Sequence, residues 1–342
     1  MSIDVKQYLR NKAKAHPKKV VFPEAQEERI LRAAREMCDL GIAFPILVGK
    51  PETITEFAQS LGISLNGIRI ADNTDEPAVD ATIESYLKIS QLHSAKSLKR
   101  QARIPLNYAV MLEAIGEADC TVAGLVHTTA EVILAAQNLI GMQEGMETIS
   151  SWGVWSIPGW EGSDGNLLVH ADCAVVVDPT PAELADIAIA SADTTAALLD
   201  IEPRVALLSF STKGSGVHEK SERVVEALNI VRQRRPDLKI DGELQLDSAI
   251  VPAVAARKVK EPSEVAGKAN ILIFPDLNAG NIGVKLVQVF AHADAFGPLL
   301  QGFAKPITDL SRGHSVEQII GAATNVIVLA EGMKKKQVIS GQ

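Results

Sequence analysis

The sequence predicts an α/β protein with mostly parallel sheets, and two observations indicate this class. Short apolar runs are each followed by a polar turn and then by a segment whose apolar residues recur at helical spacing. Aromatic residues make up only 4% of the chain, so Ala, Val, Ile and Leu must form the core, as is usual where helices pack on buried parallel strands. The length of 342 residues exceeds what one hydrophobic core usually serves, and therefore predicts two domains.

The first strand and helix are predicted near the N-terminus. Residues 20–22 form a short apolar run that predicts a strand, and Pro23 and Glu24 interrupt it. A helix follows, because apolar residues then recur at the helical period until a stop at Gly41. These helical positions are Ile30, Leu31, Ala33, Ala34, Met37 and Cys38. The next apolar run, FPILV at 44–48, predicts the second strand.

The same order of strand, turn and helix recurs further along the chain. It is seen in CTVAGLVHTTAEVILAAQNLIG at 120–141, RVALLSFSTKGSG at 204–216 and ANILIFPDLNAGNIGVKLVQVF at 269–290. Alternating strands and helices of this kind are typical of parallel sheets joined by right-handed crossovers.

Residues 150–166, SSWGVWSIPGWEGSDGN, are predicted to form an irregular loop. They hold all three tryptophans, four glycines and a proline. We place a domain boundary near the start of this segment. It is either a surface excursion anchored by buried aromatic rings or a segment that shapes a ligand cleft.

Composition excludes several classes of function. The formal net charge of −8 argues against a nucleic-acid binder, which needs a basic face. Three scattered cysteines without a CxxC pair predict a reducing cytoplasm, and Cys173 is expected to be a small buried hydrophobe. We expect no signal peptide and no apolar run approaching the ~18 residues that span a membrane. The histidines show no HxxxH or HExxH spacing, so no catalytic metal is expected.

Four predicted strand ends carry small polar residues. Ligands of open α/β sheets bind beyond the carboxyl ends of the strands, where helix N-termini offer free N–H groups. Each loop alone suits a helix cap, but four of them in one chain favour a site for a phosphate, to which an arginine adds a charged grip. The residues are His127, Thr128 and Thr129; Ser211, Thr212, Gly214 and Ser215; Asp276, Asn278, Gly280 and Asn281; and Asp309, Ser311 and Arg312.

Other nucleotide and nucleophile motifs do not fit. STKGSG at 211–216 is not a Walker A loop, and the dinucleotide fingerprint fails because Glu219 stands where a glycine is needed. Ser211 and Ser215 lack a GxSxG elbow, so a covalent serine enzyme is not expected. His127 is either a general base or a histidine that orients its loop, and we favour the second interpretation.

Several stretches together resemble the phosphate acetyltransferase family. They are VVFPEAQEERILRAA, AGLVHTTAEV, ADCAVVVDPTPAELADIAIASADT, PRVALLSFSTKGSG, KANILIFPDLNAGNIGVKL and GPLLQGFAKPITDLSRG, in the family's order from residue 20 to about 325. The resemblance implies two three-layer α/β/α domains of the isocitrate/isopropylmalate dehydrogenase kind, with the active-site cleft between them. It also implies a homodimer, and a first domain at 1–147 and 300–342 around a second at 148–299.

The resemblance implies a cytoplasmic enzyme of acetate metabolism. Such enzymes transfer an acetyl group reversibly between coenzyme A and inorganic phosphate, use coenzyme A as a substrate and need no tightly bound cofactor or metal. Ser311 and Arg312 match the family's Ser-Arg pair, which hydrogen-bonds the reacting group and neutralises phosphoryl charge. Loops of the family's cleft match the substrate-binding candidates His127, Thr128, Thr129, Ser211, Thr212, Gly214, Ser215, Asn278 and Asn281.

Three positions depart from the family's pattern. Gln318 stands at the catalytic position where the family commonly has an acidic base for the thiol, and an amide cannot accept that proton. Leu134 and, by a looser alignment, His93 stand where the family has arginines that help to hold coenzyme A. A thiol costs about 2 kcal/mol to ionise at pH 7, so Gln318 would slow the reaction without abolishing it.

These departures leave alternatives open. One is a non-catalytic protein that senses acyl-coenzyme A, and another is a phosphate acyltransferase for a different short acyl group. The intact Ser311–Arg312 pair favours an active enzyme over the sensor. A decarboxylating dehydrogenase of related architecture ranks last, because the chain lacks a set of metal-binding aspartates with a matching arginine cluster.

Overall fold

The computed structural model describes residues 4–340, with side chains up to residue 335. Within these residues the chain forms two compact units. The central unit comprises residues 4–8 and Gly145–Gly302, and the terminal unit comprises Leu9–Glu144 and residues 303–340. The described chain therefore begins in the central unit, forms most of the terminal unit, crosses back into the central unit at Gly145 and ends in the terminal unit.

The terminal unit is built on a parallel sheet of five strands. The strand order is β11-β4-β1-β2-β3, and every neighbouring pair is parallel. The last strand of the chain, β11, thus lies at the edge next to β4. The bounds are Lys18–Phe22 for β1, Ala43–Val48 for β2, Arg69–Ala71 for β3, Cys120–Ala123 for β4 and Ile307–Asp309 for β11.

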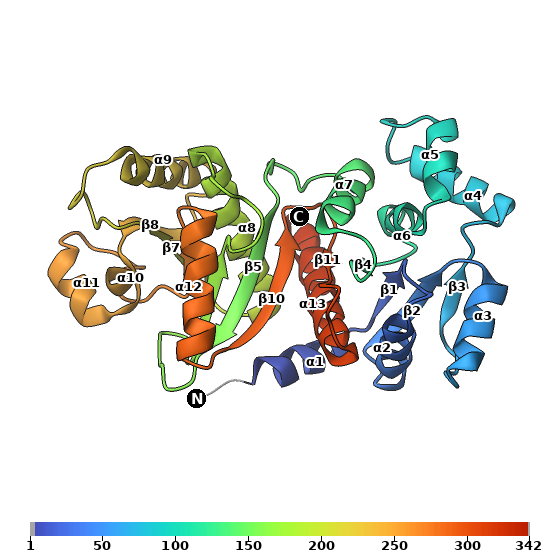
Figure 1. Ribbon diagram of the computed structural model, residues 1–342. Helices are drawn as coiled ribbons and strands as arrows, with labels where there is room; N and C mark the ends of the chain where they lie inside the picture. Colours follow the sequence, from blue (N-terminus) through green and yellow to red (C-terminus); the bar gives the residue numbers. More distant parts are fainter. Residues whose placement is uncertain (1–3, 341–342) are drawn as a thin grey trace. The chain divides into compact units, whose positions relative to one another are not determined.

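Helices cover both faces of this sheet (Figure 1). Helices α2 and α13 pack on each other and on the strands, while α6 packs on β1, β2 and β4 together with α7. The predicted first strand and helix are confirmed as β1 and α2, and Gly41 follows the helix at a φ of 67°. Helix α1, Val5–Ala15, begins in the central unit and ends in the terminal unit. The other helices are α2 Glu28–Asp39, α3 Pro51–Ser60, α4 Glu76–Leu87, α5 Ala95–Ala102, α6 Pro105–Ala114, α7 Thr129–Leu139 and α13 Val316–Ser340.

Helix α13 corrects one expectation from the sequence. Its segment Val316–Lys335 is long and apolar enough to cross a membrane by length and composition, whereas no such run was expected. In the structure 56% of its most apolar window is buried, and the helix packs on β1, β4 and β11. A helix buried in a core passes the same hydropathy test as a membrane span, which explains the difference. Ile319, Ile320, Ala323, Val326 and Ile327 are its fully buried residues.

The central unit is built on a sheet of six strands in the order β10-β5-β6-β9-β7-β8. Strand β5 is antiparallel to both of its neighbours, and the other neighbouring pairs are parallel. The sheet is therefore mostly parallel, as the sequence predicts. The bounds are Ser150–Ser156 for β5, Leu167–Ala171 for β6, Arg204–Leu208 for β7, Lys239–Leu244 for β8, Ile271–Ile273 for β9 and Asp294–Gln301 for β10.

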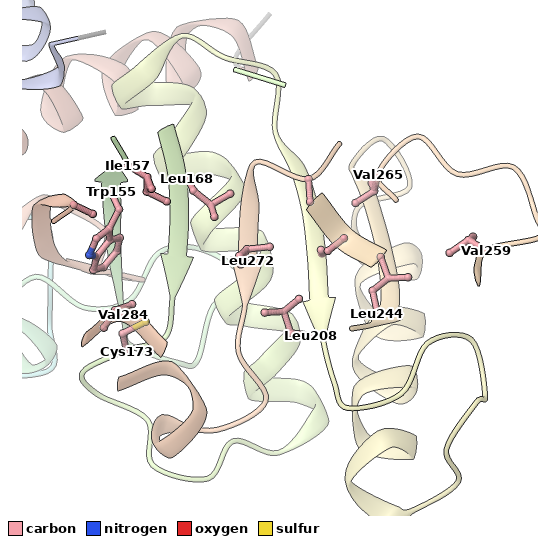
Figure 2. Packing of buried hydrophobic residues seen from close by; sticks show 14 residues of the cluster. Trp155, Ile157, Leu168, Cys173, Leu208, Leu244, Val259, Val265, Leu272 and Val284 are labelled. Carbon is pink, nitrogen blue, oxygen red and sulfur yellow. The ribbon is translucent and has the colours of Figure 1, made fainter. Parts of the chain in front are cut away.

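Figure 2 shows how aliphatic side chains of this sheet and its helices form the core of the central unit. Leu168, Leu208 and Leu272, on β6, β7 and β9, are buried together, and Cys173 is buried among them as predicted. Helix α8 packs on five of the strands and α9 packs on α8, β7 and β8, while α10 contacts β7 and α12 contacts β6. The helices are α8 Pro181–Leu199, α9 Glu219–Arg234, α10 Leu246–Ile250, α11 Pro252–Lys258 and α12 Leu277–Phe290.

The expectation of an irregular loop at 150–166 is wrong for its first half. Residues 150–156 form β5, a strand between β10 and β6 that is buried along nearly its whole length. Trp152 is 1% exposed, and its indole N–H donates to the hydroxyl of Thr195 at 2.8 Å. Tryptophan and valine favour strands, and here tertiary pairing outweighs the glycine and serines around them.

Candidate active site

The carboxyl ends of β1, β4 and β11 lie side by side, because the three strands are parallel neighbours in the sheet. Three segments follow them: residues 23–29 after β1, 124–129 after β4 and 310–318 after β11. We call these segments together the β1/β4/β11 edge. It holds six of the predicted site residues, namely His127, Thr128, Thr129, Ser311, Arg312 and Gln318.

Glu24 organises the loop after β4. Its buried carboxylate accepts hydrogen bonds from the backbone N–H groups of Gly124, Leu125, Val126 and His127 at 2.9–3.2 Å. Burial alone would raise the pKa of Glu24, but hydrogen bonds from the His127 side chain and the loop N–H groups outweigh it and lower the pKa to about 2. A negative charge therefore holds this loop in place, whereas the sequence pattern around Glu24 indicated only the end of a strand.

His127 is the side-chain partner of Glu24. Its Nδ1 lies 2.9 Å from Glu24 Oε1, and the side chain is 21% exposed. The hydrogen bond to Glu24 raises the pKa of His127 against the opposing effect of burial. His127 is thus joined to the carboxylate that holds the loop after β4, and both interpretations from the sequence, a general base and a residue that orients its loop, stay predictions.

Thr128 and Thr129 start helix α7 and tie it to the end of β11. Thr128 is the N-cap residue and forms a capping box with Glu131. The hydroxyl of Thr129 donates to Oδ2 of Asp309, the last residue of β11. Burial raises the pKa of Asp309, whose Oδ1 is buried without a hydrogen-bond partner among the described residues.

Gly124 lets the β4 and β11 loops approach each other closely. Its φ is 120°, and a Cβ at this position would lie 2.4 Å from both Asp309 Oδ1 and the backbone nitrogen of Leu310. The backbone N–H of Leu310 donates to the carbonyl oxygen of Ala123 at 2.7 Å. Only glycine fits here, because any side chain would push the segment after β11 away from the loop after β4.

Arg29 fixes the backbone of the Ser311–Arg312 segment. Its Nη1 donates to the carbonyl oxygens of Arg312 and His314, at 2.8 Å each. The other edge of the guanidinium pairs with both carboxylate oxygens of Glu27 at 3.0 Å. Arg29 was not among the predicted site residues, although a carboxylate two residues before an arginine at a helix start was a visible signal.

The side chain of Arg312 itself is exposed and takes part in no hydrogen bond or ion pair with residues 4–335. It still lies within electrostatic reach of Glu131. The N–H and the hydroxyl of Thr128 lower the pKa of Glu131 most, and the positive charges of His127 and Arg312 lower it further. Positive charge on His127 or on Arg312 therefore favours the ionised form of Glu131, at the start of α7.

Gln318 serves the first turn of α13. Its side-chain Oε1 accepts from the backbone N–H of Ser315 at 2.9 Å, and its backbone N–H donates to the hydroxyl of Ser315 at 3.3 Å. These reciprocal bonds are those of a capping box. The amide is thus engaged at the helix end and offers no proton acceptor of suitable basicity.

The two other positions that depart from the family's pattern, Leu134 and His93, lie on or beside helix α7. Leu134 lies on this helix with its side chain 58% exposed. His93 lies near the end of the same helix, with its Nε2 2.9 Å from the carbonyl oxygen of Asn138. Neither residue supplies the positive charge that an arginine at its position would bring.

In the central unit, the predicted loop after β7 is held by internal hydrogen bonds. The buried hydroxyl of Ser211 donates to Glu243 Oε1 at 2.8 Å and accepts from the N–H of Gly216 at 2.9 Å. Gly214, at a φ of 79°, also donates its N–H to Glu243, at 2.7 Å. Thr212 and Ser215 are bonded to each other through N–H and hydroxyl at 2.9 Å.

The other predicted loop of the central unit follows β9, the neighbour of β7 in the sheet. Asn278 is exposed in the first turn of α12, which Asp276 caps by accepting from the N–H of Ala279. Asn281 donates to the carbonyl oxygen of Cys173 at 3.1 Å, so this side chain is already engaged. Lys220 Nζ in α9 lies 4.0 Å from Asp276 and connects the two loops.

Comparison with known proteins covers nearly the whole chain. The family model described as Phosphate acetyl/butaryl transferase matches residues 4–330. A phosphate acetyltransferase of Borreliella burgdorferi is 44% identical over 331 residues, covering 93% of this chain and 92% of that protein. One of Clostridium acetobutylicum is 42% identical over 325 residues, covering 93% of this chain and 96% of its own length.

The chain is also similar in structure to a solved protein of this kind. A phosphotransacetylase from Streptococcus pyogenes has a TM-score of 0.88 and 37% sequence identity, and the match covers 97% of this chain and 99% of that chain. The likeness therefore extends over residues of both units.

Proposed function

Because this chain belongs to the Phosphate acetyl/butaryl transferase family, we propose that it transfers an acetyl group reversibly between coenzyme A and inorganic phosphate. The chain is an acyltransferase, coenzyme A is its substrate, and the family carries no tightly bound cofactor. The β1/β4/β11 edge is the place in the terminal unit where this reaction is assigned.

The exposed guanidinium of Arg312 carries this assignment. Its backbone is fixed by Arg29, while its side chain has no partner among the described residues. A cation whose backbone is held in place, and whose side chain makes no hydrogen bond or ion pair among the described residues, suits a substrate with negative charge, such as a phosphoryl group. The neighbouring hydroxyl of Ser311 is also exposed and accepts only a long 3.4 Å contact from the N–H of Gly313.

These groups support direct transfer in a ternary complex. The thiolate of coenzyme A attacks the carbonyl carbon of acetyl phosphate, a C–S bond forms, and the C–O bond to phosphate breaks with its electron pair going to the leaving phosphate. Arg312 balances the charge of the phosphoryl group, and Ser311 donates a hydrogen bond to the reacting oxygen. The reverse direction makes acetyl phosphate by the same contacts.

Substrate contacts are assigned to further loops in both units. In the terminal unit the first turn of α7, with His127, Thr128 and Thr129, adds the N-terminal end of a helix dipole to the positive charge of Arg312. In the central unit the loop after β7 is held in one conformation by the internal hydrogen bonds of Ser211, Thr212 and Ser215, and we assign it as a preformed wall of the substrate site. The central residues proposed to bind substrate are Ser211, Thr212, Gly214, Ser215, Asn278 and Asn281.

A homodimer is proposed for the whole protein. Helix α12 presents an exposed apolar stripe in which Ile282, Leu286, Val289 and Phe290 are each at least half exposed. Their spacing places them on one face of the helix, and apolar faces of this kind mark association surfaces. The scattered free cysteines support a location in the cytoplasm.

The test of the proposed function is an assay of free thiol. Purified protein with acetyl-coenzyme A should release thiol when inorganic phosphate is added, and the same assay with propionyl- and butyryl-coenzyme A ranks the acyl groups. A faster reaction with a longer acyl group would assign the chain to that substrate instead. Binding of acetyl-coenzyme A by calorimetry without any phosphate-dependent thiol release would make the chain a sensor.

A further inference from the structure

Position 318 offers no side chain that can take a proton from coenzyme A. The attacking form is the thiolate, and a thiol with a pKa near 8.5 is only about 3% ionised at pH 7. Gln318 has a neutral side-chain amide whose Oε1 accepts from the N–H of Ser315, while the backbone N–H of Gln318 donates to the hydroxyl of Ser315. If the chain transfers acetyl groups as proposed above, another group at the β1/β4/β11 edge must accept that proton.

The carboxylate of Glu24 decides which nitrogen of His127 carries a proton. Glu24 already accepts from four backbone N–H groups, and an ionised carboxylate has no proton to donate. Nδ1 of His127, at 2.9 Å from Glu24, must therefore be the donor in this contact. In the neutral imidazole this leaves the lone pair on Nε2, which is the nitrogen that can accept a proton.

The position of Nε2 suits a substrate. This nitrogen has no partner among the described residues, and the His127 side chain is 21% exposed, so it is open to solvent. The loop of His127 is joined to the segment of Arg312 through the hydrogen bond from Thr129 to Asp309. The positive charges of His127 and Arg312 both lower the pKa of Glu131, which caps the same helix α7.

We propose that His127, held by Glu24, is the base that accepts the thiol proton of coenzyme A. The S–H proton moves to Nε2, and its bonding electrons stay on sulfur as the thiolate. The imidazolium that forms keeps donating from Nδ1 to Glu24, whose charge stabilises it. After transfer the proton passes from Nε2 to the leaving phosphate or to water, and in reverse Nε2 protonates the departing thiolate.

The charged groups around His127 determine at which pH it can act. Glu24 and Glu131 both favour the imidazolium, and Glu24 does so most strongly. Asp309 faces Glu24 from the end of β11, and its own pKa is raised by burial. Arg312 also acts on Glu131, whose pKa its positive charge lowers.

The test replaces the base by an amide. His127→Asn keeps an N–H donor for Glu24 but has no basic nitrogen, and His127→Gln is a second variant of the same kind. Near pH 7 we expect kcat/KM for coenzyme A, measured with acetyl phosphate, to fall about 100-fold. The deficit should then shrink about tenfold per pH unit towards pH 8.5, because the thiol ionises by itself there.

A matched control is His16→Asn. His16 is an exposed histidine that precedes β1 at the opposite end of the strand, with its Nδ1 4.0 Å from Glu331. It should keep the full rate at every pH, and thermal melting should show that all three variants are folded.

A deficit that stays constant with pH, or full activity of folded His127→Asn and His127→Gln, would overturn the role of His127 as the base. Neither result affects the proposed function, because the parent enzyme is measured in the same assay. A parent enzyme without phosphate-dependent transfer would instead remove both the proposed function and this inference.

Discussion

At the scale of single residues, the β1/β4/β11 edge separates charges that hold the backbone from charges left free for a substrate. Glu24 accepts hydrogen bonds from N–H groups of the loop after β4, and Arg29 donates hydrogen bonds to carbonyl oxygens of the segment after β11. Arg312, in contrast, has an exposed guanidinium. A residue of the first kind shapes the site, whereas a residue of the second kind should act on the reacting groups.

Replacement of Arg312 should therefore affect turnover rather than folding. We expect Arg312→Ala to lower kcat for acetyl transfer at least ~100-fold, because a charge contact of the transition state is lost. Arg32→Ala is the matched control, since Arg32 is also an exposed arginine but is paired with Glu28 on α2 at 2.7 Å. Steady-state kinetics of both variants decide the point, and a near-normal rate of Arg312→Ala would remove its assigned role.

Position 318 gives a second prediction at the same scale. Gln318→Glu keeps the capping box, because glutamate is the usual partner of serine there, so its carboxylate stays on the N–H of Ser315. We expect the rate at pH 7 to change by less than about threefold, with unchanged thermal stability. Gln318→Ala should instead lose about 1 kcal/mol of unfolding free energy. A tenfold faster Gln318→Glu enzyme would show that this side chain reaches the thiol.

Sequence reasoning found the polar residues of the site but not their partners. Ser311, Arg312 and His127 were recognisable by residue type and by their place after apolar runs. The bond from Arg29 to the carbonyl of Arg312 joins residues 283 positions apart, and spacing alone cannot predict it. The role of Gln318 was visible in principle, since Ser315 and Gln318 form a Ser-x-x-Gln pattern before an apolar helix.

At the scale of elements, β4 and α6 enclose a buried acid that the site does not use. Glu113 of α6 is 0% exposed, and burial raises its pKa to about 8. Its Oε2 accepts from the hydroxyl of Thr121 in β4, and Oε1 has no partner among the described residues. Glu113 is thus mostly protonated and neutral at pH 7 in the folded protein, whereas in the unfolded chain it is ionised at this pH.

Because of Glu113, the free energy of unfolding is expected to fall as the pH rises. The pKa is about 8 in the folded state and 4.5 in the reference state, so the folded state holds more protons between these values. The free energy of unfolding should therefore fall as pH rises from about 4.5 to 8, at up to 1.4 kcal/mol per pH unit from this group. Glu113→Gln should remove that slope in denaturant titrations, and an unchanged slope would contradict the assignment.

The elements themselves were predictable where apolar runs and turns agree. Strand β1 and helix α2 follow from their periodicity, and so do the polar loops after β4, β7 and β9. Strand β5 was missed because Gly153 and three serines look like loop residues. Its pairing with β6 and β10, which come from later in the chain, supplies the context that local sequence lacks.

At the scale of the whole molecule, the exposed stripe on α12 bears on association. We expect Phe290→Glu to convert a dimer into monomers, because a carboxylate replaces a side chain that is 78% exposed in the single chain and would be desolvated in an interface. Phe44→Glu is the control, since Phe44 on β2 is also exposed, at 58%. Light scattering after size exclusion reports the mass, and a dimeric Phe290→Glu protein would place the contact elsewhere.

The family and its reaction were within reach of the sequence, because its signature stretches are spread over residues 20 to about 325. Composition alone predicted only the class of fold and argued against a nucleic-acid binder. The choice of acyl group depends on the shape of a pocket around the acyl chain, which residue types along the sequence do not specify.

The claim that Arg312 and Ser311 carry acetyl transfer is tested most directly by phosphorus NMR of the protein mixed with acetyl-coenzyme A and inorganic phosphate. The account predicts an acetyl phosphate resonance that grows in step with free thiol, and its loss over the same time with Arg312→Ala. Equal growth with Arg312→Ala, or no acetyl phosphate from the unaltered protein, would contradict it.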